Sequence, residues 1–422
     1  MNSYDAYFRY NDGELTCEGL PLREAAERFG TPLYVYTERG FRERYMEIDR
    51  ALDGVPHLIC YSIKSNSNVN ILRIMADMGS GMDVVSGGEI RRALAAGVDP
   101  RKIVFAGVGK TDEEISGAID EKILMFNCES FEEMERIDEI SRAKGTVSDI
   151  SIRVNPDVDA NTHHYIRTGR KENKFGIDID RLKERGDFIR GLSGLRLIGI
   201  HCHIGSQIVE LPPFTAALTR LLTLIGGLKR DGFSDIAYIN LGGGMGIRYR
   251  DEEFFPIEDW AREVRGRVSA AGLKLIVEPG RYISGNNGVL LVRLLYKKRT
   301  GDRLFLITDG GMNDLIRPSL YSAYQNILNC VRRRLGGGGR GGTHLRVRGF
   351  FRKGTRNYHQ SARRLPRGDV IRRIRHGDGV TIQLAAPARR GADRSGREPA
   401  LDQKARDLRR YDRPRACAVK LI

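Results

Sequence analysis

Between about residues 35 and 280 the sequence alternates short apolar runs with longer amphipathic segments that are rich in charge. This alternation is typical of parallel strands that are each followed by a helix. Eight strands with helices between them over about 250 residues predict a (β/α)8 barrel of the TIM type, spanning 35–282. A doubly wound open sheet is the competing interpretation, and the number of strands favours the barrel. The predicted strands are HLICYSI (57–63), MDVVS (82–86), IVFAG (103–107), ILMFN (123–127), ISIRVN (150–155), LIGIHCHIG (197–205), AYINLGGG (237–244) and KLIVEPG (274–280).

The segments on either side of the predicted barrel have strand patterns of their own. Residues 1–34 include YFRYNDGELTCEGLPL, which alternates like an edge strand. NNGVLLVRLLYKKRT and RLFLITDGG, within 283–327, also read as strands. We therefore expect a second, mostly β domain, built from the N-terminal segment and the region after the barrel.

Residues 328–422 differ from the rest in composition. From Val331 to the end there are 26 Lys and Arg but 7 Asp and Glu, a net charge of +19. Because the whole chain has a net charge of +16, residues 1–330 carry −3. The positive charge of the whole chain therefore does not indicate a body that binds nucleic acid. We expect 328–422 to be an aberrant basic tail that is poorly ordered.

Three absences in the sequence bear on location. The six cysteines are scattered and no C-x-x-C occurs, which favours reduced thiols over a disulfide framework or a zinc site. No apolar run reaches the roughly 18 residues that a membrane span needs. The first residues lack the basic and apolar regions of a secretory signal. We expect a cytoplasmic protein with no membrane span and no bound metal.

Lys64 comes directly after the first predicted barrel strand, at the end of the barrel where active sites lie. The apolar run before it would desolvate the ammonium group, lower its pKa and suit it to Schiff-base chemistry. The competing interpretation is a lysine that simply extends into solvent at a strand end, and position alone favours that one.

Other polar groups follow the later strands. LGGGMG offers backbone N–H groups without side chains, as a phosphate site needs, although it does not match G-x-G-x-x-G and glycine clusters are often only turns. Glu278, at the end of an apolar strand, would pair with a ring nitrogen or with a structural arginine. His203 would stack on a cofactor ring or be a hydrogen-bonded core histidine. Together with Lys64 these groups make a pyridoxal phosphate site.

The motifs that carry these residues resemble those of the fold-type III pyridoxal phosphate-dependent decarboxylases. YSIKSNSN, MDVVSGGEI, HCHIGSQ, NLGGGMGI and EPGRYI follow one another in the order found in that family, and the resemblance covers roughly residues 5–327. It implies that Lys64 and His203 are catalytic, with Lys64 bound to pyridoxal 5′-phosphate and His203 stacked on its ring. It also implies that the cofactor is held by Lys64, Asp83, His203, Ser206, Gly242, Gly243, Gly244, Glu278, Pro279, Gly280 and Arg281.

Two further segments resemble the branch of the family that acts on diaminopimelate. They are HHYIRTGRKENKFGI (163–177) and DGGMNDLIRPSLYSAY (309–324). The resemblance implies that Arg281, Arg317 and Tyr321 contact the substrate. Guanidinium groups suit a substrate that keeps a second carboxylate at its far end. The implied reaction is the decarboxylation of meso-2,6-diaminopimelate to L-lysine and CO2, the last step of lysine biosynthesis, by a homodimer with shared active sites.

The resemblance stops in the tail. The family continues with a CESGD motif, whose cysteine donates a proton across a dimer interface, and with a GAYG tyrosine, and neither string occurs here. Cys330 lies in a different context and does not take that role. GRGGTHLRVRGF (339–350) can be encoded so that loss of its first nucleotide yields DVVGPICESGD, and the same offset in IQLAAPAR (382–389) yields FNSRLRP. We therefore expect the chain to leave its reading frame between Ile327 and Gly339, although LPRGDVI (365–371) resembles the family as written.

Two alternatives remain at this stage. One is another decarboxylase of the same family that acts on a related amino acid. The other is a non-catalytic, cofactor-binding protein whose basic tail binds nucleic acid. The tail has few aromatic residues and no recognisable RNA-binding motif, which makes nucleic acid the less favoured partner.

Overall fold

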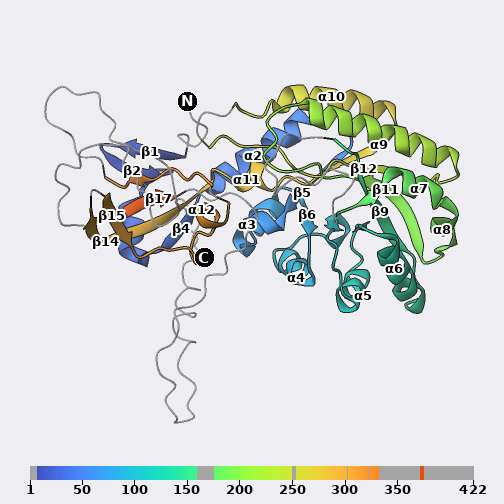
Figure 1. Ribbon diagram of the computed structural model, residues 1–422, viewed down its shortest axis with the longest axis horizontal. Helices are drawn as coiled ribbons and strands as arrows, with labels where there is room; N and C mark the ends of the chain where they lie inside the picture. Colours follow the sequence, from blue (N-terminus) through green and yellow to red (C-terminus); the bar gives the residue numbers. More distant parts are fainter. Residues whose placement is uncertain are drawn as a thin grey trace, which may run out of the picture.

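The computed structural model describes residues 7–158, 175–249, 253–301, 303–321 and 323–331, together with one strand at 371–374. Its larger part is a closed ring of eight parallel strands surrounded by helices (Figure 1). In ring order the strands are β5 (His57–Ser62), β6 (Gly81–Val84), β7 (Ile103–Phe105), β8 (Met125–Cys128), β9 (Ser148–Asn155), β11 (Leu195–His201), β12 (Tyr238–Asn240) and β13 (Lys274–Val277).

The ring is closed because β13 pairs with β5, and this confirms the (β/α)8 barrel over the open sheet. A short strand, β10 (Ile177–Asp178), extends the pairing beside β9. The helices that cover the barrel are α2 (Glu38–Ala51), α3 (Val69–Asp77), α4 (Gly87–Ala95), α5 (Asp112–Asp120), α6 (Phe131–Ala143), α7 (Ile179–Glu184), α8 (Gly186–Gly191), α9 (Pro212–Arg230) and α10 (Ile257–Ala270).

Hydroxyl side chains mark the starts of three consecutive helices. Ser86 accepts a hydrogen bond from the backbone N–H three residues on, and so does Ser130. Thr111 forms a capping box with Glu114. Each cap satisfies an N–H group that a helix start leaves without a partner. These caps fix where the chain turns from the carboxyl end of a strand into the next helix.

A second sheet lies beside the barrel (Figure 1). Its centre is β14 (Gly288–Thr300), which pairs with β15 (Arg303–Thr308), with β4 (Leu33–Tyr36) and with β17 (Ile371–Ile374). β16 (Leu328–Asn329) pairs with β17. α12 (Arg317–Leu320) lies between β15 and β16 in the chain. The decisive contact is β4 with β14, because it joins two segments more than two hundred residues apart into one sheet, as a second β domain requires.

The N-terminal segment differs from the single edge strand that its alternation suggested. It forms β1 (Phe8–Asn11), β2 (Glu14–Cys17) and β3 (Leu20–Pro21), followed by α1 (Leu22–Phe29). The reason is the Asp12–Gly13 pair, whose φ angles of 48° and 83° make a two-residue hairpin turn. The expected boundary at residue 34 also falls inside β4, which pairs with β14 and not with the barrel.

The tail also differs in part from the expectation. Residues 328–331 continue the ordered chain: Leu15 N–H donates to the Cys330 carbonyl at 2.6 Å, and the Cys330 side chain is buried with Phe8, Leu15 and Val289. Residues 371–374 form β17, which begins at the last residue of the segment that resembles the family as written. The rest of 332–422 lies outside the described residues.

Candidate active site

The interior of the barrel changes from apolar to polar toward the carboxyl ends of its strands. Deeper in the ring lies an apolar cluster made by Cys60, Val104, Met125, Ile198 and Ile276. Above it the strand ends contribute buried polar side chains: Ser62, Asp83, Asn127, Ser151, His201, Asn240 and Glu278. Buried polar groups cost free energy unless they are paired, so this layer indicates a site rather than a packed core.

Lys64 lies on a short 3-10 turn, η2 (Ile63–Ser65), directly after β5. Its Nζ donates to Asp83 Oδ2 at 2.8 Å, and Ser62 Oγ donates to the same oxygen. Asp83 is fully buried, whereas 46% of the Lys64 side chain is exposed. The structure therefore joins two of the predicted site residues in an ion pair at the mouth of the barrel.

The pair corrects one expectation about Lys64. We predicted that desolvation would lower its pKa. Burial does act in that direction, but Asp83 and Glu278 outweigh it, and the pKa of Lys64 is raised above its usual value. The sequence could not show this, because the opposing carboxylates belong to other strands.

Glu278 receives polar contacts from three other strands of the ring, β8, β11 and β12. Its Oε1 accepts from Asn240 Nδ2 at 2.7 Å and from Asn127 Nδ2 at 3.1 Å. Its Oε2 lies 3.3 Å from His201 Nε2. Burial raises the pKa of Glu278, but His201, Lys64 and Asn240 together outweigh burial and hold the pKa well below its usual range. Glu278 is thus an ionised carboxylate inside the barrel.

The glycine turn after β12 is packed against the neighbouring loops. A Cβ on Gly242 would overlap the Cys202 carbonyl oxygen, one on Gly243 would overlap the Glu278 carbonyl oxygen, and one on Gly244 would lie 2.7 Å from the Gly205 carbonyl oxygen. Gly242 and Gly244 also have φ angles of 64° and 108°. Only glycine fits these positions.

The same turn departs from the expectation of a row of N–H groups that are open to phosphate. Gly242 N–H donates to Asn240 Oδ1 at 2.8 Å, and Gly243 N–H donates to His203 Nδ1 at 3.2 Å. These two N–H groups therefore hold neighbouring side chains in place. The turn supports the site through its close packing as much as through its amides.

His203 follows β11 and is held in one tautomer. Because its Nδ1 accepts from Gly243, a proton on the neutral ring belongs on Nε2. Burial, followed by the nearby Arg153 and Lys64, lowers the pKa of His203 to about 3. The ring is therefore neutral at physiological pH, as a side chain that stacks on a flat ligand would be.

Arg281 connects two of the predicted regions. It begins α11 (Arg281–Ser284), and its guanidinium donates to Ser206 Oγ at 2.8 Å and to the Tyr249 hydroxyl at 3.0 Å. The Arg317 guanidinium lies 5.9 Å from the centre of the same Tyr249 ring and 5.7 Å from that of Tyr321. Tyr249 thus links Arg281 with Arg317, and Tyr321 lies beside Arg317.

The remaining predicted site residues take backbone positions. The Pro279 carbonyl accepts from Ser62 N–H at 3.3 Å, which ties the end of β13 to β5. Gly280 lies close to Ser62 and Ser65: a Cβ added to it would be 3.1 Å from the Cβ of Ser62 and 3.2 Å from the Cβ of Ser65. Residues 163–174 of the predicted substrate loop lie outside the described residues.

Comparison with known proteins identifies the family of the chain. Residues 38–285 match the family model described as "Pyridoxal-dependent decarboxylase, pyridoxal binding domain". A diaminopimelate decarboxylase of Pseudomonas aeruginosa is 48% identical over 320 residues, 76% of this chain and 77% of that protein. One from Aquifex aeolicus is 44% identical over 329 residues, 78% of each chain. This chain belongs to the diaminopimelate decarboxylase family.

Solved structures of family members share the fold. The Helicobacter pylori diaminopimelate decarboxylase, crystallised with L-lysine, matches with a TM-score of 0.76 and 35% identity, over 85% of this chain and 90% of that one. The enzyme of M. jannaschii, also in complex with L-lysine, matches with a TM-score of 0.79 and 32% identity over 90% of each chain. The protein is accordingly a carboxy-lyase with pyridoxal 5′-phosphate as its cofactor.

The residues of this decarboxylase suit that cofactor. Asp83 Oδ1 is buried and has no hydrogen-bond partner among the described residues, so the site has room for a further donor. Glu278 is an ionised carboxylate of the kind that pairs with a protonated ring nitrogen. Gly242, Gly243 and Gly244 let the backbone come close where any side chain would intrude. Within the described ranges no group of three or more His, Cys, Asp or Glu is placed to hold a metal ion.

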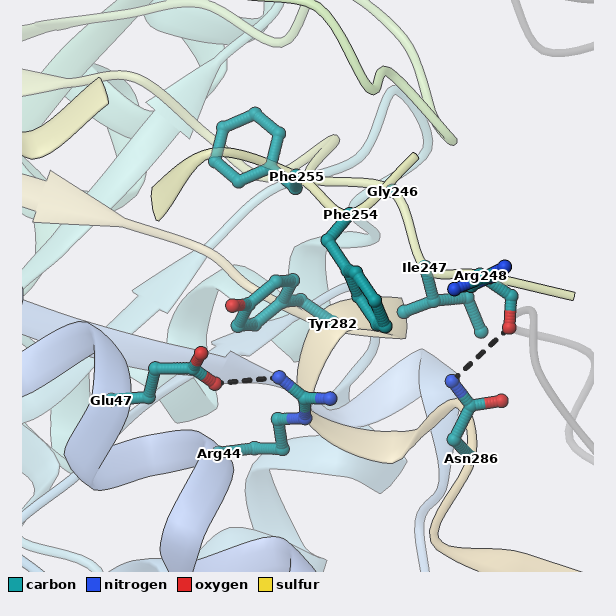
Figure 2. A pocket seen from close by; sticks show the side chains of 9 residues that line it. All are labelled: Arg44, Glu47, Gly246, Ile247, Arg248, Phe254, Phe255, Tyr282 and Asn286. Carbon is teal, nitrogen blue, oxygen red and sulfur yellow. Dashed lines mark hydrogen bonds and ion pairs between the residues drawn. The ribbon is translucent and has the colours of Figure 1, made fainter. Parts of the chain in front are cut away.

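A separate hollow of about 240 Å³ lies next to the site. Figure 2 shows Arg44 paired with Glu47 on α2, with Tyr282, Phe254 and Asn286 around them. The Arg44 guanidinium is 5.3 Å from the centre of the Tyr282 ring, and Asn286 donates to the Arg248 carbonyl at 3.4 Å. The hollow contains none of the predicted site residues, and its contacts brace the α11 segment that carries Arg281.

Sequence reasoning missed several residues of the site. Asn127, Asn240 and His201 are single polar residues within apolar strands, and an unusual polar residue in a buried run is the signal that could have found them. Tyr249 lies in a loop without any motif. Arg153 donates to Glu129 at 2.6 Å, with 7% and 2% of the two side chains exposed. Glu129 also accepts from Gly176 N–H at 2.9 Å, at the edge of the predicted substrate loop.

Proposed function

We propose that this chain catalyses the pyridoxal phosphate-dependent decarboxylation of meso-2,6-diaminopimelate to L-lysine and CO2. The observation that carries the proposal is the convergence of Lys64, Asp83, His203, the glycine turn and Glu278 at one end of the barrel, beside Arg281 and Arg317. Relatives that are 44–48% identical are named diaminopimelate decarboxylases, and two solved relatives hold L-lysine.

When bound, pyridoxal phosphate supplies an electron sink for the electron pair left behind by CO2. In the proposed site Lys64 would hold the cofactor through its amine, which Asp83 keeps in position. Glu278 would present its carboxylate to the ring nitrogen, and His203 would lie against the ring as a neutral imidazole. Ser206, oriented by Arg281, and the amide of Gly244 would hold the phosphate. Pro279 and Gly280 bring the end of β13 close to Ser62.

Arg281, Arg317 and Tyr321 are the proposed substrate-binding residues. Arg317 is only 5% exposed, and burial lowers its pKa, so its guanidinium lies in surroundings where pairing with an anion is most favourable. A substrate with a carboxylate at its far end can pair with the Arg317 guanidinium. A substrate whose far end carries only a cationic group would place a second positive charge beside it. This charge preference favours diaminopimelate over ornithine, arginine or lysine among the substrates of related decarboxylases.

The proton that replaces CO2 needs a donor, and the family's CESGD cysteine is missing from the sequence. Cys330 does not substitute, because it is 2% exposed in the core of the second sheet, and burial raises its pKa to about 12. We propose that the tail is the out-of-frame product of the segment that encodes this cysteine. The chain as written would then bind the cofactor but decarboxylate poorly, and sequencing the coding DNA around codons 327–339 tests this directly.

We propose further that the protein is a homodimer in the cytoplasm. β14 and β15 expose large apolar side chains, Tyr296 at 69%, Leu295 at 47% and Ile307 at 39%, as a surface covered by a second copy would. The five described cysteines are free thiols. Among the described residues no helix is long and apolar enough to cross a bilayer. Sedimentation equilibrium of the purified chain tests the dimer.

The function is tested by incubating the purified chain with pyridoxal phosphate and meso-diaminopimelate and measuring L-lysine and CO2. The same assay with ornithine, arginine and lysine tests the related-decarboxylase alternative. A frame-restored chain is the matched positive control, and its Lys64→Ala variant is the negative one. Lysine formation by the frame-restored chain supports the proposal. Faster release of a diamine from another substrate would contradict it.

A further inference from the structure

His201 is a buried histidine that opens the HCHIGSQ motif and to which the sequence assigned no role. It is the last residue of β11, lies opposite Asn240 in the register with β12, and is 1% exposed. Two residues later in the same segment comes His203, on which the sequence analysis concentrated. Unlike His203, His201 faces the carboxylate at the end of β13, with its Nε2 3.3 Å from Glu278 Oε2.

The two oxygens of Glu278 are served by different kinds of partner. Oε1 accepts from the side-chain amides of Asn127 and Asn240. Oε2 has the imidazole of His201 as its neighbour. Neither ring nitrogen of His201 has a hydrogen-bond partner within the part of the chain that the structure describes, and of the two Nε2 is the one that lies 3.3 Å from a carboxylate oxygen. An unpaired lone pair is a smaller penalty than an unpaired N–H, so the proton of a neutral ring belongs on Nε2, directed at Glu278.

A second consideration is the pairing of charges in the site. Two buried carboxylates, Asp83 and Glu278, lie near one lysine. Lys64 is bonded to Asp83 at 2.8 Å, so it compensates Asp83 first. Compensation for Glu278 must then come from its other neighbours. Of these, His201 does most to hold the pKa of Glu278 below its usual range against the effect of burial.

The geometry points to His201 as a positioning residue: its imidazole keeps Glu278 ionised and turned so that a carboxylate, not a neutral acid, meets the ring nitrogen of the cofactor. The inference rests on the proposed function, because it needs the cofactor to bind with its ring nitrogen at Glu278. His201 itself touches neither substrate nor reacting atoms. It acts on the cofactor only through the charge and orientation of Glu278.

The experiment compares two probes on cofactor-free protein, pyridoxal phosphate and 1-deazapyridoxal phosphate, in which a carbon replaces the ring nitrogen. Dissociation constants are measured by absorbance and fluorescence titration for the parent and for His201→Leu, which keeps the apolar volume but has no donor. We expect His201→Leu to raise the dissociation constant for pyridoxal phosphate about tenfold, which corresponds to about 1.4 kcal/mol of binding free energy. The deaza analogue should bind as it does to the parent, because it makes no demand on the charge of Glu278.

Three further variants make the result specific. His201→Gln places an amide N–H near the position of Nε2 and should restore most of the affinity for pyridoxal phosphate. Ser148→Ala, a buried polar change at the amino end of β9 where Ser148 bonds to Ser141, should leave both constants unchanged. His201→Asn is shorter and cannot reach Glu278, so it replaces the leucine variant if that protein does not fold.

The outcomes separate the inference from the function on which it rests. If His201→Leu loses affinity for both probes equally, His201 has a merely structural role and the inference is overturned. If it loses affinity for neither probe, the inference is also overturned. Failure of His201→Gln to recover affinity also counts against it. If the parent chain does not bind pyridoxal phosphate at all, the proposed function itself is refuted.

Discussion

Lys64 Nζ and Asp83 Oδ2 are 2.8 Å apart across the neighbouring strands β5 and β6. The carboxylate is fully buried and the lysine is half-exposed, so the pair raises the pKa of Lys64. Asp83→Asn should lower that pKa and increase the fraction of neutral amine at a given pH. We expect reductive methylation of Lys64 in the cofactor-free protein, followed by peptide mass spectrometry, to reach its half-maximal rate at a lower pH than in the parent.

Asp77→Asn is the matched control for this substitution. Asp77 is an exposed aspartate on α3, and its loss should leave the labelling midpoint of Lys64 unchanged. A midpoint that does not move in Asp83→Asn would show that the ion pair does not control the protonation of Lys64.

The barrel was predictable because each of its strands is an apolar run followed by a charged helix, and this repeats eight times. The places of Lys64, His203, Glu278 and Arg281 near the carboxyl ends of apolar strands could be predicted for the same reason. Their mutual pairing could not. The pKa of Lys64 depends on Asp83, a neighbour that exists only once the strands are in register. Asn127 contacts Glu278 from across the ring only because the ring closes, and Asn240 contacts it from the paired strand β12. Tyr249 reaches Arg281 from a loop with no motif.

The close packing of the glycine turn predicts a large loss of stability on adding one methyl group. A Cβ on Gly243 would overlap the carbonyl oxygen of Glu278, which is backbone and cannot move aside alone. Gly243→Ala should therefore destabilise the fold by about 2–4 kcal/mol, measured by urea unfolding. In Gly266→Ala, in the middle of α10, the new Cβ meets nothing within 4 Å. That control should gain about 0.5–1 kcal/mol.

Two ion pairs that involve β9 differ mainly in burial and make a matched comparison. Arg153 and Glu129 are 2.6 Å apart with 7% and 2% of their side chains exposed. Arg196 and Asp149 are also 2.6 Å apart, but with 55% and 26% exposed. Arg153→Leu should cost about 3–5 kcal/mol, because it leaves a buried carboxylate without its cation. Arg196→Leu should cost about 1 kcal/mol or less.

Urea unfolding at pH 7.5 measures both changes, and replacing each pair as a whole refines the test. The double variant Arg153→Leu, Glu129→Leu removes the unpaired charge and should recover much of the loss. If both single arginine variants cost the same, burial does not determine the strength of these pairs.

Four of the described cysteines should be unreactive in the folded protein. Burial raises the pKa of Cys202 and of Cys330 to about 12, and it also raises the pKa of Cys60 and of Cys128. Because the thiolate is the reactive form, we expect negligible iodoacetamide labelling of these thiols at pH 8 and complete labelling in urea. Peptide mass spectrometry identifies each site. Rapid native labelling of Cys330 would place it outside the core of the second sheet.

The neutral state of His203 predicts how stability depends on pH. Its pKa is about 3 in the fold and about 6.5 in an unfolded chain, so the unfolded state takes up the proton first. The contribution of His203 is fully present above pH 6.5 and is lost as the pH falls toward 3. From pH 7.5 to 5 the loss is about 2 kcal/mol. His203→Asn keeps an acceptor for Gly243 N–H but does not titrate in this range. In cofactor-free protein the stability difference between parent and variant should therefore shrink by that amount on acidification, as followed by urea unfolding. Thr223→Ala, an exposed change on α9, is the control, and its difference in unfolding free energy from the parent should not change with pH. If the difference for His203→Asn also stays constant, His203 is protonated in the folded state.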